Sequence, residues 1–540
     1  MNEPIPASIF PDPEAVPEAW RLAVPVDQRS WLCGGELRTW NGLTQPVLSP
    51  ICHPGPSGVE RAVIGSYPLM SAAESLQVLE AASRAWDQGR GLWPTMPVEE
   101  RIHHVAAFSA RMQEQRGEIV KRLMWEIGKN QVDAEKEFDR TIEYIRDTIS
   151  ALKELDRLSS RFVIEEGVIG QIRRSPLGVV LCMGPFNYPL NETFTTLIPA
   201  LIMGNPVIFK PPKLGVLLFE PLLAAFRDCF PPGVINTIYG DGATIITPLM
   251  ESGRIDVLAF IGTSRVADIL RRAHPKPHRL RCVLGLDAKN PAIILKDADL
   301  DLAVKECVLG ALSFNGQRCT ALKMIWVHAE VCDLFLEKLS AAVAALKCGM
   351  PWEPGVQITP LPEEGKTGRL HEYIRDAEER GARVINPGGG SVQGTCMTPA
   401  ILYPVSAGMR LYTEEQFGPL IPVASFSEIG EPLHYISESS YGQQVSLFGN
   451  DAKVLAGLID PLVNQLCRVN LNSQCQRGPD SFPFTGRKDS AEGTLSVSDA
   501  LRVFTIRALV AAKENSANQG IIREIVTERT SRFLSTDFIF

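Results

Sequence analysis

The chain has 540 residues, which is too long for a single hydrophobic core and predicts two or three domains. Its hydrophobic fraction of 45% and charged fraction of 21% are those of an ordinary globular protein. The formal net charge of −8 argues against nucleic acid or an anionic membrane surface as a partner, so an anionic ligand would need a local cluster of cations.

The cysteines and the N-terminus indicate the compartment. Twelve cysteines include no C-x-x-C pair, so we expect neither a disulfide framework nor a zinc ribbon, and we predict no metal site. The start, "MNEPIPASIFPDPEAV", has neither the basic nor the apolar segment of a secretory signal. The longest apolar stretch, "FTTLIPALIMGNPVIF", is broken by Pro and Gly and is shorter than the ~20 residues of a membrane span. We therefore expect a cytoplasmic protein with reduced thiols.

The first 155 residues change from irregular to helical. Residues 1–70 are rich in Pro and Gly and are expected to be irregular with short strands. Ser71 and Glu74 have the spacing of a capping box and precede an amphipathic pattern. Between 131 and 155, apolar residues recur at alternating spacings of four and three, which predicts a long helix. They are Phe138, Ile142, Ile145, Ile149 and Leu152.

From residue 177 onward, short apolar strands alternate with helices. The strands "GVVLCMG", "NPVIFK", "VINTIYG", "IDVLAFIG" and "LRCVLGL" predict an α/β fold with a doubly wound parallel sheet. Such sheets bind ligands at the carboxyl ends of their strands. A second αβ series begins near residue 298 and runs to about 490, and the pattern after residue 515 predicts no particular structure.

Three of these strands end in residues that suit a ligand site. Asn187 in "GPFNYP" can donate to a developing oxyanion, or it can form an ordinary Asx turn. Lys210 and Lys213 in "FKPPK" can reach a ribose or phosphate, or they can be solvated turn residues. Gly262 and Thr263 in "FIGTSRVAD" open a helix that can seat a pyrophosphate, although helix capping alone explains the threonine.

Cys319 in "FNGQRCTALK" is the candidate nucleophile. It follows a flexible Asn-Gly turn and is flanked by Arg318 and Thr320 rather than by an apolar run. A neighbouring guanidinium favours the thiolate, which is the reactive form of cysteine. On this stretch alone, a nucleophile and an unreactive turn cysteine are equally good interpretations.

Taken together and in order, the motifs resemble the aldehyde dehydrogenase superfamily over residues 70 to 510. The motifs are "GPFNYP", "FKPPK", "FIGTS", "NGQRCTALK", "EEQFGP" and "YGQQVSLFGND". The segment "VNLNSQCQRGPDSFPFTGRKDS" looks like the NADP-dependent non-phosphorylating glyceraldehyde-3-phosphate dehydrogenases. The resemblance implies a dinucleotide-binding domain (1–157 and 177–297), a catalytic domain (298–490), a β oligomerisation arm (158–176 and 491–514) and a C-terminal extension (515–540).

The resemblance also implies a role for each motif. Cys319 would attack the aldehyde, while Asn187 and the Cys319 backbone N–H would hold the oxyanion. Hydride transfer to the nicotinamide would leave a thioester for water to hydrolyse. The cofactor contacts would fall on Pro185, Phe186, Lys210, Lys213, Gly262, Thr263, Glu415 and Phe417.

The substrate and the cofactor preference follow from charges. Arginine suits a phosphate because its planar fork donates two hydrogen bonds. NAD-preferring relatives carry a glutamate three residues after the lysine, whereas Lys213 would attract a 2′-phosphate, so we expect NADP, with NAD as the alternative. The resemblance places the phosphorylated substrate against Arg140, Tyr188, Arg318, Arg477 and Asp480.

One departure concerns the fate of the thioester. Relatives carry "LELGGK", whose glutamate activates water, but this chain has "LGLDAKN" with Gly285 at that position. Asp287 lies two residues further on and is expected either to serve as the base, to act only in a turn, or to leave water unactivated. Relatives that pass the acyl group to coenzyme A also lack this glutamate.

These observations leave three hypotheses. The leading one is NADP-dependent oxidation of a phosphorylated aldehyde, D-glyceraldehyde 3-phosphate, to the free acid. The second is a CoA-acylating semialdehyde dehydrogenase or another aldehyde dehydrogenase, and the third is a non-catalytic relative. The resemblance also implies a homodimer or homotetramer.

Overall fold

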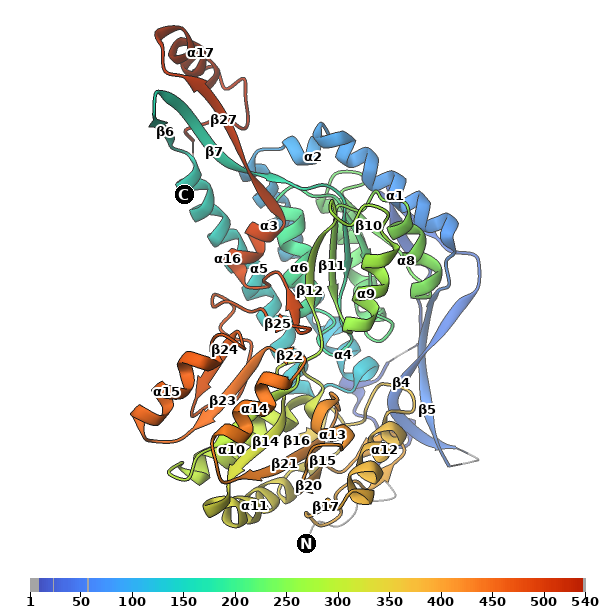
Figure 1. Cartoon of the computed structure of the whole chain (residues 1–540). Helices are drawn as coiled ribbons and strands as arrows, with labels where there is room; N and C mark the ends of the chain where they lie inside the picture. Colours follow the sequence, from blue (N-terminus) through green and yellow to red (C-terminus); the bar gives the residue numbers. More distant parts are fainter. Residues whose placement is uncertain (1–8, 23, 56–57, 538–540) are drawn as a thin grey trace.

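The computed structural model describes residues 9–22, 24–55 and 58–537 and contains two large sheets and an arm (Figure 1). The first sheet has six strands in the order β10-β9-β8-β11-β12-β26. The second has seven in the order β17-β20-β21-β14-β13-β23-β24, and the arm has three in the order β27-β7-β6. The predicted domain limits at residues 1 and 540 lie outside the described residues.

The N-terminal region is more regular than predicted. Strands β4 (Thr44–Gly55) and β5 (Gly58–Pro68) form a long antiparallel pair, and β1 (Val26–Asp27) lies beside β5. The prolines of β4 suggested irregular chain, but β4 is the edge strand of this sheet, where a residue without an N–H is tolerated. A short hairpin of β2 (Ser30–Cys33) and β3 (Glu36–Thr39) precedes it in the chain.

The predicted helices are confirmed. Helix α1 (Ala72–Trp86) begins with the capping box, in which the Ser71 N–H donates to Glu74 Oε2 at 2.9 Å. Helix α5 (Gln131–Ser159) buries its apolar stripe, including Phe138 and Ile145. Helices α3 (Val98–Gln113) and α4 (Arg116–Ile127) lie between them in the chain.

The five strands predicted for the first sheet are confirmed and are parallel. Helix α6 (Asn191–Ile202) is buried along its whole length because it lies between this sheet and helices α3, α5 and α16 (Val497–Val503). The strands are β8 (Val180–Met183), β9 (Val207–Lys210), β10 (Ile235–Thr237), β11 (Val257–Ile261) and β12 (Arg281–Gly285). The connecting helices are α7 (Leu223–Cys229), α8 (Gly242–Glu251) and α9 (Ser264–Ala273).

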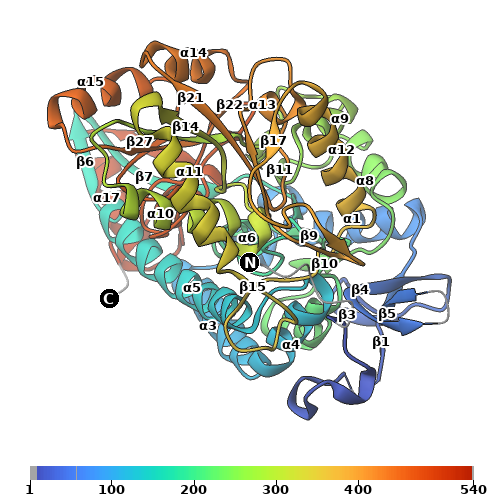
Figure 2. The same cartoon turned by 90° about the horizontal axis from the view of Figure 1, so that it is seen from below.

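The second sheet begins earlier in the chain than predicted. Strand β13 (Asn290–Ile294) pairs with β14 (Leu322–His328) and β23 (Gln444–Phe448), so the boundary expected at residue 297/298 is wrong. No helix separates β12 from β13, and the sequence therefore gave no signal that the chain changes sheet there. Helices α10 (Leu300–Leu312) and α11 (Ala329–Ala344) lie against β14 (Figure 2). The remaining strands are β17 (Arg383–Val384), β20 (Ala400–Tyr403), β21 (Leu420–Phe426) and β24 (Arg468–Leu471).

The arm projects from the body of the molecule (Figure 1). It consists of β6 (Phe162–Glu165), β7 (Val168–Pro176) and β27 (Thr505–Lys513). Its predicted second segment, 491–514, is too long, because β26 (Ala491–Glu492) pairs with β12 of the first sheet and α16 contacts α5. The C-terminal extension forms α17 (Ser516–Thr527) and then returns to the arm, where the Ser535 N–H donates to Gln171.

Candidate active site

A cavity of about 1260 Å³ lies between the carboxyl ends of the first sheet and the loop that precedes β14. Every predicted site residue lines this cavity except Asp480, which lies behind it and bonds to Arg140. Residues from both sheets therefore meet in one space, as the parallel topology requires. No helix of the described residues is long and apolar enough to cross a membrane, and the same residues contain no cluster of His, Cys, Asp and Glu that would hold a metal ion.

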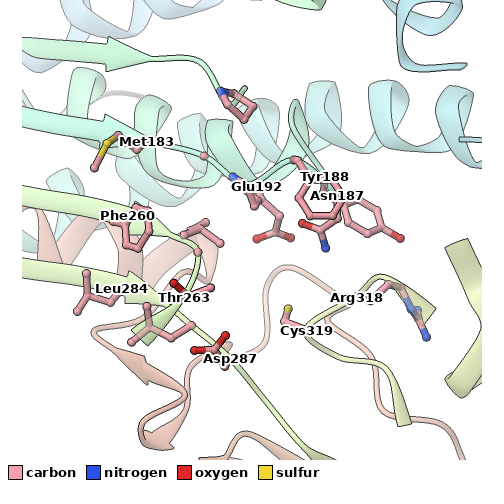
Figure 3. Close-up of a pocket in the computed structure, with 18 of the residues that line it drawn as sticks. Met183, Asn187, Tyr188, Glu192, Phe260, Thr263, Leu284, Asp287, Arg318 and Cys319 are labelled. Carbon is pink, nitrogen blue, oxygen red and sulfur yellow. The ribbon is translucent and has the colours of Figure 1, made fainter. Parts of the chain in front are cut away.

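A tight turn presents Cys319 to the cavity. Phe314 and Asn315 have positive φ angles of 48° and 56°, and the Asn315 amide bonds to Thr359, which fixes the turn. The carbonyl oxygen of Cys319 accepts from the side chains of Asn290 (2.8 Å) and Lys323 (3.0 Å). Figure 3 shows the sulfur facing the side chains of Asn187 and Glu192.

The charges around the thiol differ from those expected. Burial raises the pKa of Cys319, and Glu192 raises it further, while Lys323 and Arg477 oppose the rise. The expectation that Arg318 stabilises the thiolate is wrong. Its guanidinium points away from the sulfur (Figure 3) and donates to the carbonyl oxygens of Leu309 (3.3 Å) and Gly310 (3.0 Å) in the last turns of α10.

Two N–H donors lie beside the sulfur. The Asn187 amide donates one hydrogen to the carbonyl oxygen of Gln317 at 2.8 Å, which leaves its second hydrogen for a ligand. The backbone N–H of Cys319 has no acceptor among the described residues. Two such donors can stabilise the oxyanion that forms on a carbonyl oxygen when its carbon bonds to the sulfur.

A buried lysine that the sequence analysis missed supports Asn187. The Nζ of Lys129 donates to the Asn187 carbonyl oxygen at 2.8 Å, forms an ion pair with Glu137, and lies 3.6 Å from the centroid of the Tyr188 ring. Glu137 in turn accepts from the N–H groups of Leu190 and Asn191 at the start of α6. The pair is invisible to pattern reasoning because Lys129 lies in a loop and Glu137 adjoins the stripe of α5.

The opposite end of the cavity carries cations and a helix N-terminus. Burial lowers the pKa of Lys210 to about 8, and Lys213 is exposed nearby. In the described part of the chain, neither lysine pairs with a carboxylate. Thr263 caps α9, where it accepts from the Val266 N–H.

Asp287 bonds to the same helix N-terminus. Its Oδ2 accepts from the Ser264 N–H at 2.7 Å, so the carboxylate that we expected to act as a base is also a helix cap. Gly285, at the end of β12, lines the cavity and has no side chain to contribute.

Between these two ends lie Glu415 and Phe417. Glu415 Oε1 forms an ion pair with the buried Lys323 at 2.6 Å and accepts from the Ala288 N–H at 3.2 Å. Burial raises the pKa of Glu415, and Lys323 opposes this rise. Phe417 packs edge-on against Phe186 with 5.9 Å between the ring centroids. Pro185 lines the cavity next to Phe186.

Two of the three arginines expected to bind a phosphate, Arg140 and Arg477, are held by carboxylates. Arg140 forms a two-point bond with Asp480 at 2.7 and 2.8 Å. Arg477 is buried and pairs with both Asp480 (3.1 Å) and Glu192. Sequence reasoning missed Glu192, although an acidic residue in "LNETFTTLIPALI", a helix whose other residues are all uncharged, was a usable signal.

Comparisons with known proteins agree with this geometry. Residues 54–510 match the aldehyde dehydrogenase family. The chain is 35% identical over 452 residues to an NADP-dependent glyceraldehyde-3-phosphate dehydrogenase of Streptococcus equinus, covering 82% of this chain and 91% of that protein. The enzyme of the same name from Apium graveolens is 31% identical over 79% of this chain and 85% of its own length. The crystal structure of a third, from Bacillus halodurans C-125 with NADP bound, has a TM-score of 0.82 at 31% identity and covers 90% of this chain and 99% of that one.

Proposed function

The chain belongs to the aldehyde dehydrogenase family, and from this premise we propose that it oxidises glyceraldehyde 3-phosphate to the free acid with NADP as the oxidant. The observation that carries the proposal is the placement of the Cys319 sulfur in a cavity beside two N–H donors, from Asn187 and from its own backbone. This is the arrangement that thioester chemistry needs.

The proposed reaction assigns a role to each of these groups. The Cys319 thiolate attacks the aldehyde carbon, and the Asn187 amide with the Cys319 N–H stabilises the oxyanion. NADP held at the end of the cavity that contains Lys210 and Lys213 would supply the acceptor for the hydride that leaves this carbon. The resulting thioester is then hydrolysed, which releases the acid and restores the thiol.

The cavity fits a phosphorylated dinucleotide. Lys210 and Lys213 form no ion pair with a carboxylate among the residues described, although the charge of Asp241 acts on Lys210, so both ammonium groups can bond to an anion. The start of α9 adds the positive end of a helix dipole. We propose that Pro185, Phe186, Gly262, Thr263, Glu415 and Phe417 complete the cofactor contacts.

The substrate would lie beyond Cys319. Tyr188, Arg140, Arg318 and Arg477 line that end, and Asp480 holds two of the arginines. We propose that the substrate phosphate binds here by taking over donors of Arg140 and Arg318 that now bond to protein oxygens, while Arg477 stays paired with Glu192, and that Asp480 then accepts from a substrate hydroxyl.

Cys319→Ser tests the chemistry. The variant should lose all turnover but still bind NADP, because the sulfur does not line the lysine end. Mass spectrometry of wild-type protein treated with glyceraldehyde 3-phosphate and NADP should show an acyl adduct on Cys319 that the variant lacks. Turnover in the variant, or an adduct elsewhere, would contradict the proposal.

Lys213→Glu tests the cofactor. A negative charge at this position should repel the 2′-phosphate and raise the KM for NADP by roughly tenfold, the equivalent of ~1.4 kcal/mol, while the KM for NAD stays within twofold or improves. Lys213→Gln is the matched control and should lie between the two. Equal changes in the KM for NADP and the KM for NAD would show that Lys213 does not interact with the 2′-phosphate.

A second function is favoured by Gly285. Without a glutamate at this position, coenzyme A rather than water would resolve the thioester. An assay with and without coenzyme A decides between hydrolysis and CoA acylation. If product forms only when coenzyme A is present, the reaction is CoA acylation and not hydrolysis.

We also propose that the chain acts in the cytoplasm as a homodimer or homotetramer. The twelve cysteines are free thiols, which supports a reducing compartment. The arm exposes apolar side chains that a second copy can cover: Val163, Ile164, Val168, Ile172, Ile506, Leu509 and Val510. Light scattering on the purified protein measures the assembly, and a monomer would contradict the proposal.

A further inference from the structure

Hydrolysis of a thioester requires a base that removes a proton from the attacking water. The carboxylates near Cys319 are mostly committed to other groups. Glu137 is paired with Lys129, Glu415 with Lys323, and Asp287 with the Ser264 N–H.

Glu192 differs from these carboxylates in the direction in which its side chain points. It is the second residue of α6, its side chain is 10% exposed, and Figure 3 shows its carboxylate directed into the cavity beside the Asn187 amide and toward the Cys319 sulfur. Its Oε2 bonds to Arg477, and no donor among the described residues bonds to its Oε1. One oxygen is therefore fixed while the other is left for a ligand.

The surroundings of Glu192 hold it in this orientation. Arg477 is itself fixed by Asp480 (3.1 Å) and by the Leu495 carbonyl oxygen (3.0 Å), and its guanidinium lies 4.5 Å from the centroid of the Phe484 ring. A carboxylate in the first turn of a helix is also stabilised by the helix dipole. Among the charges that act on the Cys319 thiol, that of Glu192 has the largest effect.

We propose that Glu192 is the base that activates water for hydrolysis of the Cys319 thioester, in place of a side chain at Gly285. The inference rests on the proposed function. The Glu192 carboxylate takes a proton from water as the water oxygen bonds to the thioester carbon. The carbon–sulfur bond breaks, the thiolate of Cys319 leaves, and the free acid departs. Glu192 then returns its proton to solvent.

Glu192→Gln tests this role by separating acylation from hydrolysis. With glyceraldehyde 3-phosphate and NADP, rapid mixing should still show a burst of one NADPH per subunit, because the glutamine leaves Cys319 and Asn187 in place. Steady-state turnover should fall by ~10²–10⁴-fold, the usual contribution of a general base. Mass spectrometry should show the acyl adduct accumulating on Cys319. Glu192→Asp should restore part of the rate.

Two controls make the test specific. Asp287→Asn removes the other nearby carboxylate and should not accumulate the adduct. Hydroxylamine cleaves thioesters without a general base, so it should release the adduct from Glu192→Gln and restore NADPH formation. Circular dichroism and a thermal melt establish that each variant is folded.

The outcomes separate the inference from the function beneath it. If wild-type protein gives neither an NADPH burst nor an adduct, the proposed function fails. If the wild type behaves as expected but Glu192→Gln hydrolyses its adduct at the wild-type rate, the role of Glu192 is excluded. If only Asp287→Asn accumulates the adduct, the base is Asp287.

Discussion

Both ends of the cavity carry cationic side chains, but the two ends differ in how these side chains are paired with carboxylates. At the cofactor end, Lys210 and Lys213 have no carboxylate partner among the described residues. At the substrate end, Arg140 and Arg477 are fully engaged by Asp480 and Glu192. The first end is therefore open to an anion, whereas the second must exchange an internal partner for its ligand.

This difference has an energetic consequence. An anion that reaches the lysines gains new ionic interactions, because it displaces no carboxylate from them; Lys210 donates only to the Pro211 carbonyl oxygen among the described residues. For an anion that reaches the arginines, the free energy of binding is only the difference between the bonds that it forms and the carboxylate bonds that it replaces. We therefore expect strong cofactor affinity at the lysine end, and at the arginine end a selectivity that depends on geometry more than on charge.

The largest expected effect concerns stability. Arg477→Ala leaves the buried carboxylate of Glu192 without its cation and leaves Asp480 with Arg140 alone, and should destabilise the fold by about 3–5 kcal/mol. Lys213→Ala removes an exposed, unpaired cation and should change stability by less than ~0.5 kcal/mol. Thermal melts of both variants without ligands test the contrast, and Glu192→Gln added to Arg477→Ala should recover part of the loss. Similar melting temperatures for the two single variants would contradict the conclusion that the substrate-end cation is structurally paired while the cofactor-end cation is not.

A smaller effect is expected on substrate binding. Arg140→Ala should raise the KM for glyceraldehyde 3-phosphate by about 10–100-fold, since a hydrogen bond to a charged group contributes ~1.5–3 kcal/mol. The KM for unphosphorylated glyceraldehyde should change by less than threefold. Steady-state kinetics with both aldehydes measure this difference. Equal increases in the two KM values would show that Arg140 does not bind the substrate phosphate.

The contrast between the ends also explains what the sequence could predict. The lysines and Cys319 lie in short motifs at strand ends, and parallel topology brings strand ends together. The pairing of Arg477 with Glu192, 285 residues apart, depends on how α6 meets the loop after β24. No local pattern encodes that contact, so Glu192 and Lys129 were missed and Arg318 was misjudged.

The same reasoning applies to the fold. Strands β8 to β12 and helices α1 and α5 follow from periodicity, because each has its own local pattern of apolar residues. The boundary before β13 and the antiparallel strand β26 were missed. Both depend on which sheet a short apolar segment joins, and this choice is made by packing partners far away in the chain.

The cofactor end should respond to pH. The pKa of Lys210 is about 8, so its ammonium is charged below this pH and loses its charge above it. Affinity for NADP should therefore weaken by roughly fivefold between pH 7 and pH 9, the equivalent of losing ~1 kcal/mol from one nearby charge. Fluorescence titration of Cys319→Ser with NADP measures this without turnover. Lys210→Arg should abolish the pH step, because a guanidinium stays charged over this range. A step that persists in this variant would belong to another group.

The smallest effect concerns a carboxylate at the cofactor end that bonds to a backbone N–H. Asp287 accepts from the Ser264 N–H, which is the donor that a pyrophosphate at the start of α9 would use. At this N–H the cofactor end resembles the substrate end, since a ligand must displace an internal carboxylate. Asp287→Asn should tighten NADP binding by roughly two- to threefold, within the ~0.3–1 kcal/mol of a charge at a helix N-terminus. Weaker binding in Asp287→Asn would mean that the carboxylate orders the turn for the cofactor instead of competing with it.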